Sequence, residues 1–153
     1  MKRFFDSSAL VKRYIPEIGT ARVQSTLRAT PRSDSYIAYI TGPEIMAAFA
    51  RRLRMGDITH ADYNMATTAF ERHFRRQYTR LHLSLAVVHT AMGLTRQHRL
   101  RGYDAVQLAT ALTLRDSLRK RGITDLTFVF ADEDLCQAAA AEGLLTENPN
   151  HYP

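Results

Sequence analysis

Cysteine is almost absent from the chain, and no apolar run is long enough to cross a membrane. The single Cys136 cannot form an internal disulfide and lies in an apolar helical pattern, so we interpret it as a core residue. The apolar residues at the N-terminus meet Asp6 too early to form the hydrophobic region of a signal peptide. We therefore expect a cytoplasmic protein without membrane contact.

The motifs of several enzyme classes are also missing. The sequence has no HExxH zinc motif, no glycine-rich phosphate loop and no Gly-x-Ser-x-Gly turn, and its six histidines are scattered. Asp132 and Asp134 follow an apolar run, as in phosphatases that form an aspartyl-phosphate. Too few residues come after them to build that domain, so this alternative fails on length.

Lysine is scarce, and most of the positive charge comes from arginine. Of 21 basic residues only Lys2, Lys12 and Lys120 are lysines, and the formal net charge is +6. The planar fork of arginine suits phosphate and carboxylate groups, which favours nucleic acid or an acidic partner. A genome-wide preference for arginine gives the same composition, so charge alone is weak evidence.

No repeat, low-complexity segment or long linker divides the 153 residues, and we expect one domain spanning residues 1–153. Residues rich in β-formers predict strands at 2–5, 36–40, 81–83, 126–130 and 144–146. Helical spacing of apolar residues predicts helices at 7–14, 21–27, 41–55, 57–78, 85–98, 103–121 and 135–142. This alternation predicts an α/β fold, a three-layer α/β/α sandwich with a mainly parallel central sheet. Residues 147–149 are expected to form a frayed end.

Four acidic residues stand at strand ends or in the first turns of helices: Asp6, Glu44, Asp104 and Asp132. In open α/β sheets such positions converge on one edge, where ligands bind. Structural roles are open as well, because Asp6 can cap the next helix and Thr41 with Glu44 has the form of a capping box. Asp104 suits the dipole of its own helix. Carboxylates gathered at one point raise one another's pKa, and Mg²⁺ or Mn²⁺ would offset that charge.

Ordered segments along nearly the whole chain resemble the PIN-domain nucleases, in particular the VapC-type toxins of bacterial toxin–antitoxin pairs. The segments that carry the resemblance are 5–12, Glu44 with Ala47, Ala48 and Arg51, 102–111, 131–135, 138–139, 142–144 and 148–149. The set in this order is more specific than any single segment. The resemblance implies a metal-dependent endoribonuclease that is inhibited by a small cognate antitoxin and is usually a homodimer.

The resemblance also assigns roles to the acids. Asp6, Glu44 and Asp104 match the residues that hold the principal Mg²⁺ or Mn²⁺ ion. Asp132 matches the fourth acid, which supports a second, weaker site or positions the attacking water, and Asp134 is its rival. Phe130 departs from the family, which commonly has Ser or Thr two residues before the fourth acid. A catalytically silent PIN-like module that binds RNA or protein is the alternative function.

Two groups of arginines are candidates for contact with RNA. Arg101 lies just before Asp104, where a solvated turn residue is the alternative to substrate contact. A run on the helix predicted at 57–78 and just after it consists of Arg72, Arg75, Arg76 and Arg80. A run of this kind is usually a solvated helix face, and it serves phosphate contact only if the protein binds RNA.

Overall fold

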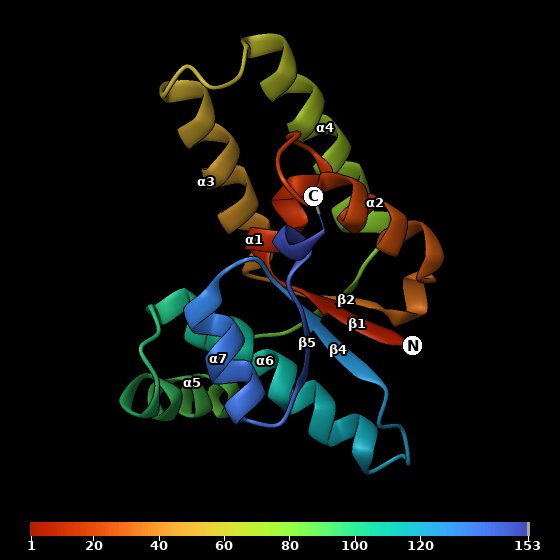
Figure 1. Ribbon diagram of the computed structural model, residues 1–153, viewed down its shortest axis with the longest axis vertical. Coiled ribbons are helices and arrows are strands. Elements are labelled where there is room, and N and C mark those ends of the chain that lie inside the picture. The colour runs from red at the N-terminus through yellow and green to blue at the C-terminus, as the bar shows by residue number, and fades with distance from the viewer. Residues whose placement is uncertain (153) are drawn as a thin grey trace.

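A parallel five-stranded sheet forms the middle layer of the molecule (Figure 1). The computed structural model describes residues 1–152. Its strands lie in the order β3-β2-β1-β4-β5, and every neighbouring pair is parallel. Their bounds are β1 (Lys2–Phe5), β2 (Ser35–Ala38), β3 (Thr79–Leu81), β4 (Leu126–Val129) and β5 (Leu145–Glu147). Because β1 is the middle strand, the residue that follows it lies at the centre of the carboxyl edge.

Helices cover both faces of this sheet (Figure 1). One face carries α1 (Ser7–Leu10), α2 (Thr20–Ala29), α3 (Thr41–Arg54) and α4 (His60–Arg76), and the other carries α5 (Leu85–Gln97), α6 (Gly102–Arg119) and α7 (Glu133–Ala141). Three short 3₁₀ turns complete the described chain: η1 (Val11–Arg13), η2 (Arg32–Asp34) and η3 (Pro149–His151). The predicted three-layer α/β/α sandwich is confirmed. Within residues 1–152 no helix combines the length and the apolar character that crossing a bilayer requires.

Alternating strand residues supply the two cores. Phe4 and Phe128 point toward α5, α6 and α7, and their ring centroids lie 5.4 Å apart. Phe5 and Val129 point the other way, toward α1, α3 and α4. Neighbouring side chains of a strand point to opposite faces, so the part of a central parallel strand that helices cover on both faces is apolar at successive positions, as at Phe4 and Phe5. This explains the continuous apolar runs that end just before the acids.

Local signals placed most helix starts within two residues, but α4 begins at His60, three residues after the predicted start at 57. Thr59 and Asp62 form a capping box at α4, and the Ser84 hydroxyl caps α5 by accepting a hydrogen bond from the Val87 N–H at 3.2 Å. The capping box predicted from Thr41 and Glu44 is wrong. Ile40 is the N-cap of α3 and makes no side-chain cap, because Thr41 is already helical.

The end of the described chain is anchored, and the frayed end predicted for residues 147–149 is wrong. Asn148 and Pro149 are buried, and η3 follows them. Arg22 on α2 donates to Glu147 at 2.7 Å, and its guanidinium lies 4.2 Å from the ring centroid of Tyr152. The segment after β5 therefore packs against α2 through contacts that local sequence does not encode.

Gly19 is the position where this packing is tightest. Its φ is +87°, and a Cβ built there would lie 2.7 Å from the carbonyl oxygen of Pro149. Gly56 has a similar φ of +77°, but a Cβ built there would have no other heavy atom within 4 Å. Both positions favour glycine because of backbone strain, but only Gly19 adds a clash with backbone.

We expect Gly19→Ala to destabilise the protein clearly more than Gly56→Ala. Left-handed strain costs each variant about 1–2 kcal/mol, and the displaced η3 adds a further loss only in Gly19→Ala. Urea denaturation of both variants beside the wild type measures the free energies of unfolding. Equal losses in the two variants would show that the contact with Pro149 contributes nothing.

Candidate active site

Asp6 lies directly after β1 and is buried, with 2% of its surface exposed. Its Oδ1 accepts hydrogen bonds from the Ala9 N–H at 3.0 Å and from the Ser8 hydroxyl at 2.8 Å. It is therefore the N-cap of α1, which confirms the structural role foreseen for it. Burial, with a smaller contribution from the charge of Glu44, raises the pKa of Asp6 to about 7 against the opposing hydrogen bonds from Ala9 and Ser8.

Glu44 lies in the first turn of α3 and is held from α6. The Gln107 Nε2 donates to Glu44 Oε2 at 2.6 Å and to the Thr41 hydroxyl at 3.0 Å. Burial raises the pKa of Glu44, hydrogen bonds from Gln107 and Ser7 lower it, and the charge of Asp104 raises it. Glu44 therefore faces the other acids and does not cap its own helix.

Asp104 and Asp132 complete the group from two further elements. Asp104 is half-buried in the first turn of α6, and burial followed by the charge of Asp132 raises its pKa, while Arg101 lowers it. Asp132 is exposed and is the N-cap of α7, since its Oδ1 accepts from the Leu135 N–H at 2.9 Å. Asp134 is also exposed, but it is Asp132 that acts on the pKa of Asp104.

The four acids thus form one electrostatic neighbourhood in which each charge acts on the next. Glu44 raises the pKa of Asp6, Asp104 raises that of Glu44, and Asp132 raises that of Asp104. Within residues 1–152 none of the four forms an ion pair with a basic side chain. In that same part of the chain, no three His, Cys, Asp or Glu side chains are gathered closely enough to hold a metal ion as they stand.

The donor chemistry of this group fits a hard divalent cation. Every candidate ligand is a carboxylate oxygen, with the Ser7 hydroxyl beside Glu44. Burial is the largest cause of the raised pKa values of Asp6, Glu44 and Asp104, and a bound dication would offset the charge of these acids when they ionise. Assignment of the four acids as metal ligands stays a prediction.

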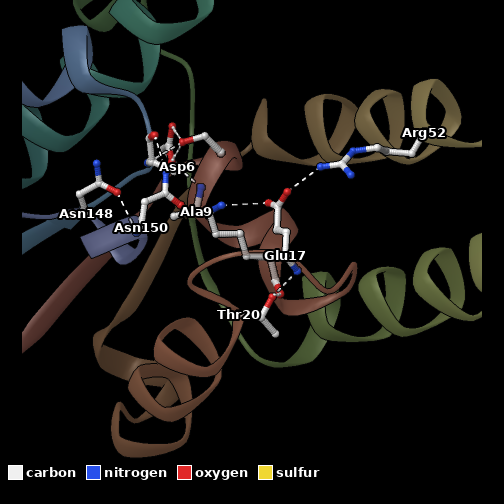
Figure 2. A network of polar contacts seen from close by, with 10 residues as sticks. Asp6, Ala9, Glu17, Thr20, Arg52, Asn148 and Asn150 are labelled. Carbon is white, nitrogen blue, oxygen red and sulfur yellow. Dashed lines mark hydrogen bonds and ion pairs between the residues drawn. The ribbon is translucent and has the colours of Figure 1, made fainter. Parts of the chain in front are cut away.

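A hydrogen-bonded chain joins the strand ends behind these acids (Figure 2). The Ser8 hydroxyl, which donates to Asp6, also accepts from the Ala131 N–H at 2.8 Å. The Asn150 Nδ2 then donates to the Ala131 carbonyl at 3.2 Å, and the Asn150 N–H donates to Asn148 Oδ1 at 2.9 Å. The segment after β5 therefore supports the loop that carries Asp132.

Sequence reasoning gave no role to Gln107 or Asn150. Gln107 is 1% exposed, and its Oε1 has no hydrogen-bond partner within residues 1–152. A glutamine beside the apolar stripe of a buried helix was the available signal. Phe130, which stands where the family commonly has Ser or Thr, is fully buried. Its ring centroid lies 4.7 Å from that of Phe128, so this side chain is part of the hydrophobic core.

A hollow of about 790 Å³ opens beside Glu44 and is rich in arginine. Its lining joins the first turns of α1 and α6 to one side of α3, and includes Ser7, Glu44, Arg51, Arg52, Arg54, Arg101 and Tyr103. We call it the active-site groove. The groove places Arg101 next to the acids, as the sequence suggested.

One arginine of the groove is held by a partly buried ion network (Figure 2). Arg52 Nη2 lies 2.6 Å from Glu17 Oε2, and Lys12 Nζ lies 3.0 Å from the other oxygen of Glu17. Lys12 is only 6% exposed, so its charge needs this partner. The network ties α3 to the segment after η1 and leaves the other arginines of the groove to solvent.

Comparison with known proteins shows the family of this chain. No family model matches the chain. The curated protein Ribonuclease VapC45 of Mycobacterium tuberculosis is 34% identical over 114 residues, which is 74% of this chain and 76% of that protein. The chain belongs to the VapC-type PIN-domain ribonuclease family. The resemblance to VapC-type PIN-domain nucleases, which rested on ordered segments of the sequence, is confirmed.

Solved structures show the same VapC-type fold. A toxin–antitoxin complex from Klebsiella pneumoniae matches with a TM-score of 0.64 and 17% identity, covering 97% of this chain and 98% of that one. VapC20 of M. tuberculosis, a toxin that cleaves the sarcin-ricin loop, matches with a TM-score of 0.65 and 16% identity, covering 94% and 97%. At these identities the likeness concerns the fold.

The raised pKa of Asp6 predicts a pH-dependent cost to folding in the absence of metal. Asp6 stays protonated in the folded state up to about pH 7, while its ordinary pKa is 3.8. The stability that protonation supplies is complete below pH 3.8 and is lost as the pH rises through about 7. This difference corresponds to at most about 4 kcal/mol.

In EDTA we expect Asp6→Asn to unfold at a higher temperature than the wild type at pH 8, by several degrees, and at nearly the same temperature near pH 4. The amide keeps the cap of α1 without the buried charge. Thermal unfolding across this pH range measures the difference, with Asp116→Asn, an exposed acid, as the control. A gain that does not depend on pH would contradict the assigned cause.

Proposed function

We propose that the protein is an endoribonuclease that hydrolyses RNA phosphodiester bonds with Mg²⁺ or Mn²⁺. The observation that carries the proposal is the group of uncompensated acids from four segments, which borders a groove lined by arginines. A surface that only binds a polyanion gains nothing from a negative pocket. Membership of the VapC ribonuclease family supports the same activity.

In this proposal Asp6, Glu44 and Asp104 hold the principal ion, and Asp132 supports a second site or positions the water. A bound dication supplies charge for the attacking and leaving oxygens and lowers the pKa of a water. Gln107 fixes one oxygen of Glu44, and the bonds from Ala9 and Ser8 fix Asp6, so both carboxylates are oriented before substrate arrives.

The arginines of the groove bind the phosphate backbone on either side of the reacting bond. Arg51, Arg54 and Arg101 are exposed and reach solvent in the groove, which suits a flexible polyanion. Contacts to backbone phosphates carry no base information, so they position the RNA without choosing its sequence.

We expect Asp6→Asn and Asp104→Asn each to abolish RNA cleavage in the presence of Mg²⁺ or Mn²⁺. The loss should exceed the roughly 100-fold that removal of an outer-shell partner costs a metal site. Asparagine keeps the shape of each side chain, so the fold stays intact by circular dichroism. Cleavage of a labelled RNA by purified wild type and variants measures this.

Asp116→Asn is the matched control, because it removes one exposed acid of α6 far from the first turn of that helix. It should cleave like the wild type. Cleavage that survives both Asp6→Asn and Asp104→Asn would contradict the proposal. Wild type that binds RNA but never cleaves it with either ion would favour the alternative, a catalytically silent binding module.

The proposal includes a small antitoxin as partner, a homodimeric toxin and a cytoplasmic location, where RNA is available. A related fold is present in a toxin–antitoxin complex.

We expect the protein encoded beside this gene to copurify with the chain when both are expressed and to suppress RNA cleavage. Size-exclusion chromatography with light scattering reports the assembly. Failure of the two chains to copurify would count against an antitoxin at that locus.

A further inference from the structure

A second hollow, of about 610 Å³, lies at the edge of the sheet opposite the acids. It forms where α2, η2 and the end of α4 meet the start of β2, and Figure 1 shows α2 beside that end of α4. Ser35, which begins β2, lines this hollow, whereas Asp6 follows the carboxyl end of β1. At about 3.3 Å per residue, a four-residue strand separates the two edges by roughly 10 Å.

Four arginines from four separate elements line the hollow, namely Arg13 of η1, Arg28 of α2, Arg32 of η2 and Arg76 of α4. No acidic residue is part of its lining. Within residues 1–152 none of these arginines forms an ion pair with an acid. We call this hollow, with its four arginines, the amino-edge site.

Other arginines of the protein are occupied by its own groups. Arg22, Arg52 and Arg115 pair with acids, and Arg80 donates to the Phe74 carbonyl at 2.9 Å while it lies over the Tyr39 and Phe74 rings. Of the run on α4 and after it, Arg76 is the member that lines the amino-edge site. The cluster therefore leaves four positive charges in one hollow, where they repel one another unless an anion binds.

Part of the amino-edge site is preorganised. Arg13 Nη1 donates to the hydroxyl of the buried Tyr78 at 2.6 Å, and its guanidinium lies 5.6 Å and 5.9 Å from the ring centroids of Tyr14 and Tyr78. Arg3 reaches the same wall from β1 by donating to the Thr30 hydroxyl at 2.8 Å. A guanidinium fixed in this way loses less entropy on binding phosphate than a free one.

We propose that the amino-edge site is an exosite for the phosphate backbone of the RNA substrate. The inference rests on the proposed function, because RNA is then the polyanion that the protein meets. Two arginine-lined hollows at opposite edges of the sheet match a chain of evenly spaced phosphates that extends past the cleaved bond. The amino-edge site binds nucleotides away from that bond and so adds affinity without taking part in the reaction.

The test compares two variants that lose the same charge. Arg28→Gln/Arg32→Gln/Arg76→Gln removes the exposed arginines of the amino-edge site and keeps Arg13, which packs on Tyr78. Arg96→Gln/Arg119→Gln/Arg121→Gln removes three exposed arginines elsewhere. Binding of a fluorescent single-stranded RNA, long enough to cross the molecule, is followed by anisotropy in EDTA over a salt series.

We expect the amino-edge variant to lose affinity by about tenfold or more, and its log–log salt slope to fall by ~2, which is the value for three lost contacts to single-stranded RNA. The control variant should change much less. Both should unfold at the wild-type temperature, because all six side chains are exposed. Equal losses in the two variants would overturn the exosite, since they would show an effect of net charge alone.

Unchanged RNA binding combined with lost binding to an acidic protein partner would also overturn it, by assigning the hollow to that partner. The metal-free measurement separates this inference from the proposed function. If RNA binding depends on the amino-edge site but the wild type never cleaves RNA with Mg²⁺ or Mn²⁺, the function fails and the exosite stands. If the wild type cleaves RNA but the two variants bind RNA alike, the proposed function stands and the exosite fails.

Discussion

Burial of the Asp6 carboxylate at the end of the central strand is the constraint around which this protein is arranged. β1 has neighbours on both sides and helices on both faces, so the residue after it cannot reach bulk water. A carboxylate there loses its hydration and keeps only the hydrogen bonds of Ala9 and Ser8. The charge of Glu44 makes its ionisation still less favourable. The fold therefore buries an ionisable carboxyl group without a cationic partner at the centre of the carboxyl edge, where ionisation is costly.

The same side chains that begin helices also build this site. Asp6 caps α1 and Asp132 caps α7, while each also takes part in the electrostatics of the acid group. A helix that follows a parallel strand begins at the carboxyl edge, so its cap already faces the crevice. Under the proposed function, helix capping and metal binding would be two uses of one position. Glu44 is different, because its orientation comes from Gln107 on another helix.

Charge is separated over the molecule in a way that suits a polyanionic substrate. Negative charge is concentrated at the buried carboxyl edge, and arginines surround it in the active-site groove and gather again at the amino-edge site. The excess of six positive charges is therefore not spread evenly as a solvated coat. Under the proposed function, long-range attraction would bring a phosphate chain to the protein, and a bound cation would offset the charge of the acids that it meets.

The sequence by itself determined the alternation of strands and helices, the four acids at their junctions, and the option that Asp6 caps the helix after it. These follow from local physics, because apolar periodicity and side-chain bonds to nearby N–H groups need only neighbouring residues. Tertiary structure alone decided that Glu44 bonds to Gln107 and that the segment after β5 packs on Gly19. It also decided that Arg76, among the α4 arginines, lines the amino-edge site. Each of these depends on residues far apart in the chain, where local propensity carries no information about the partner.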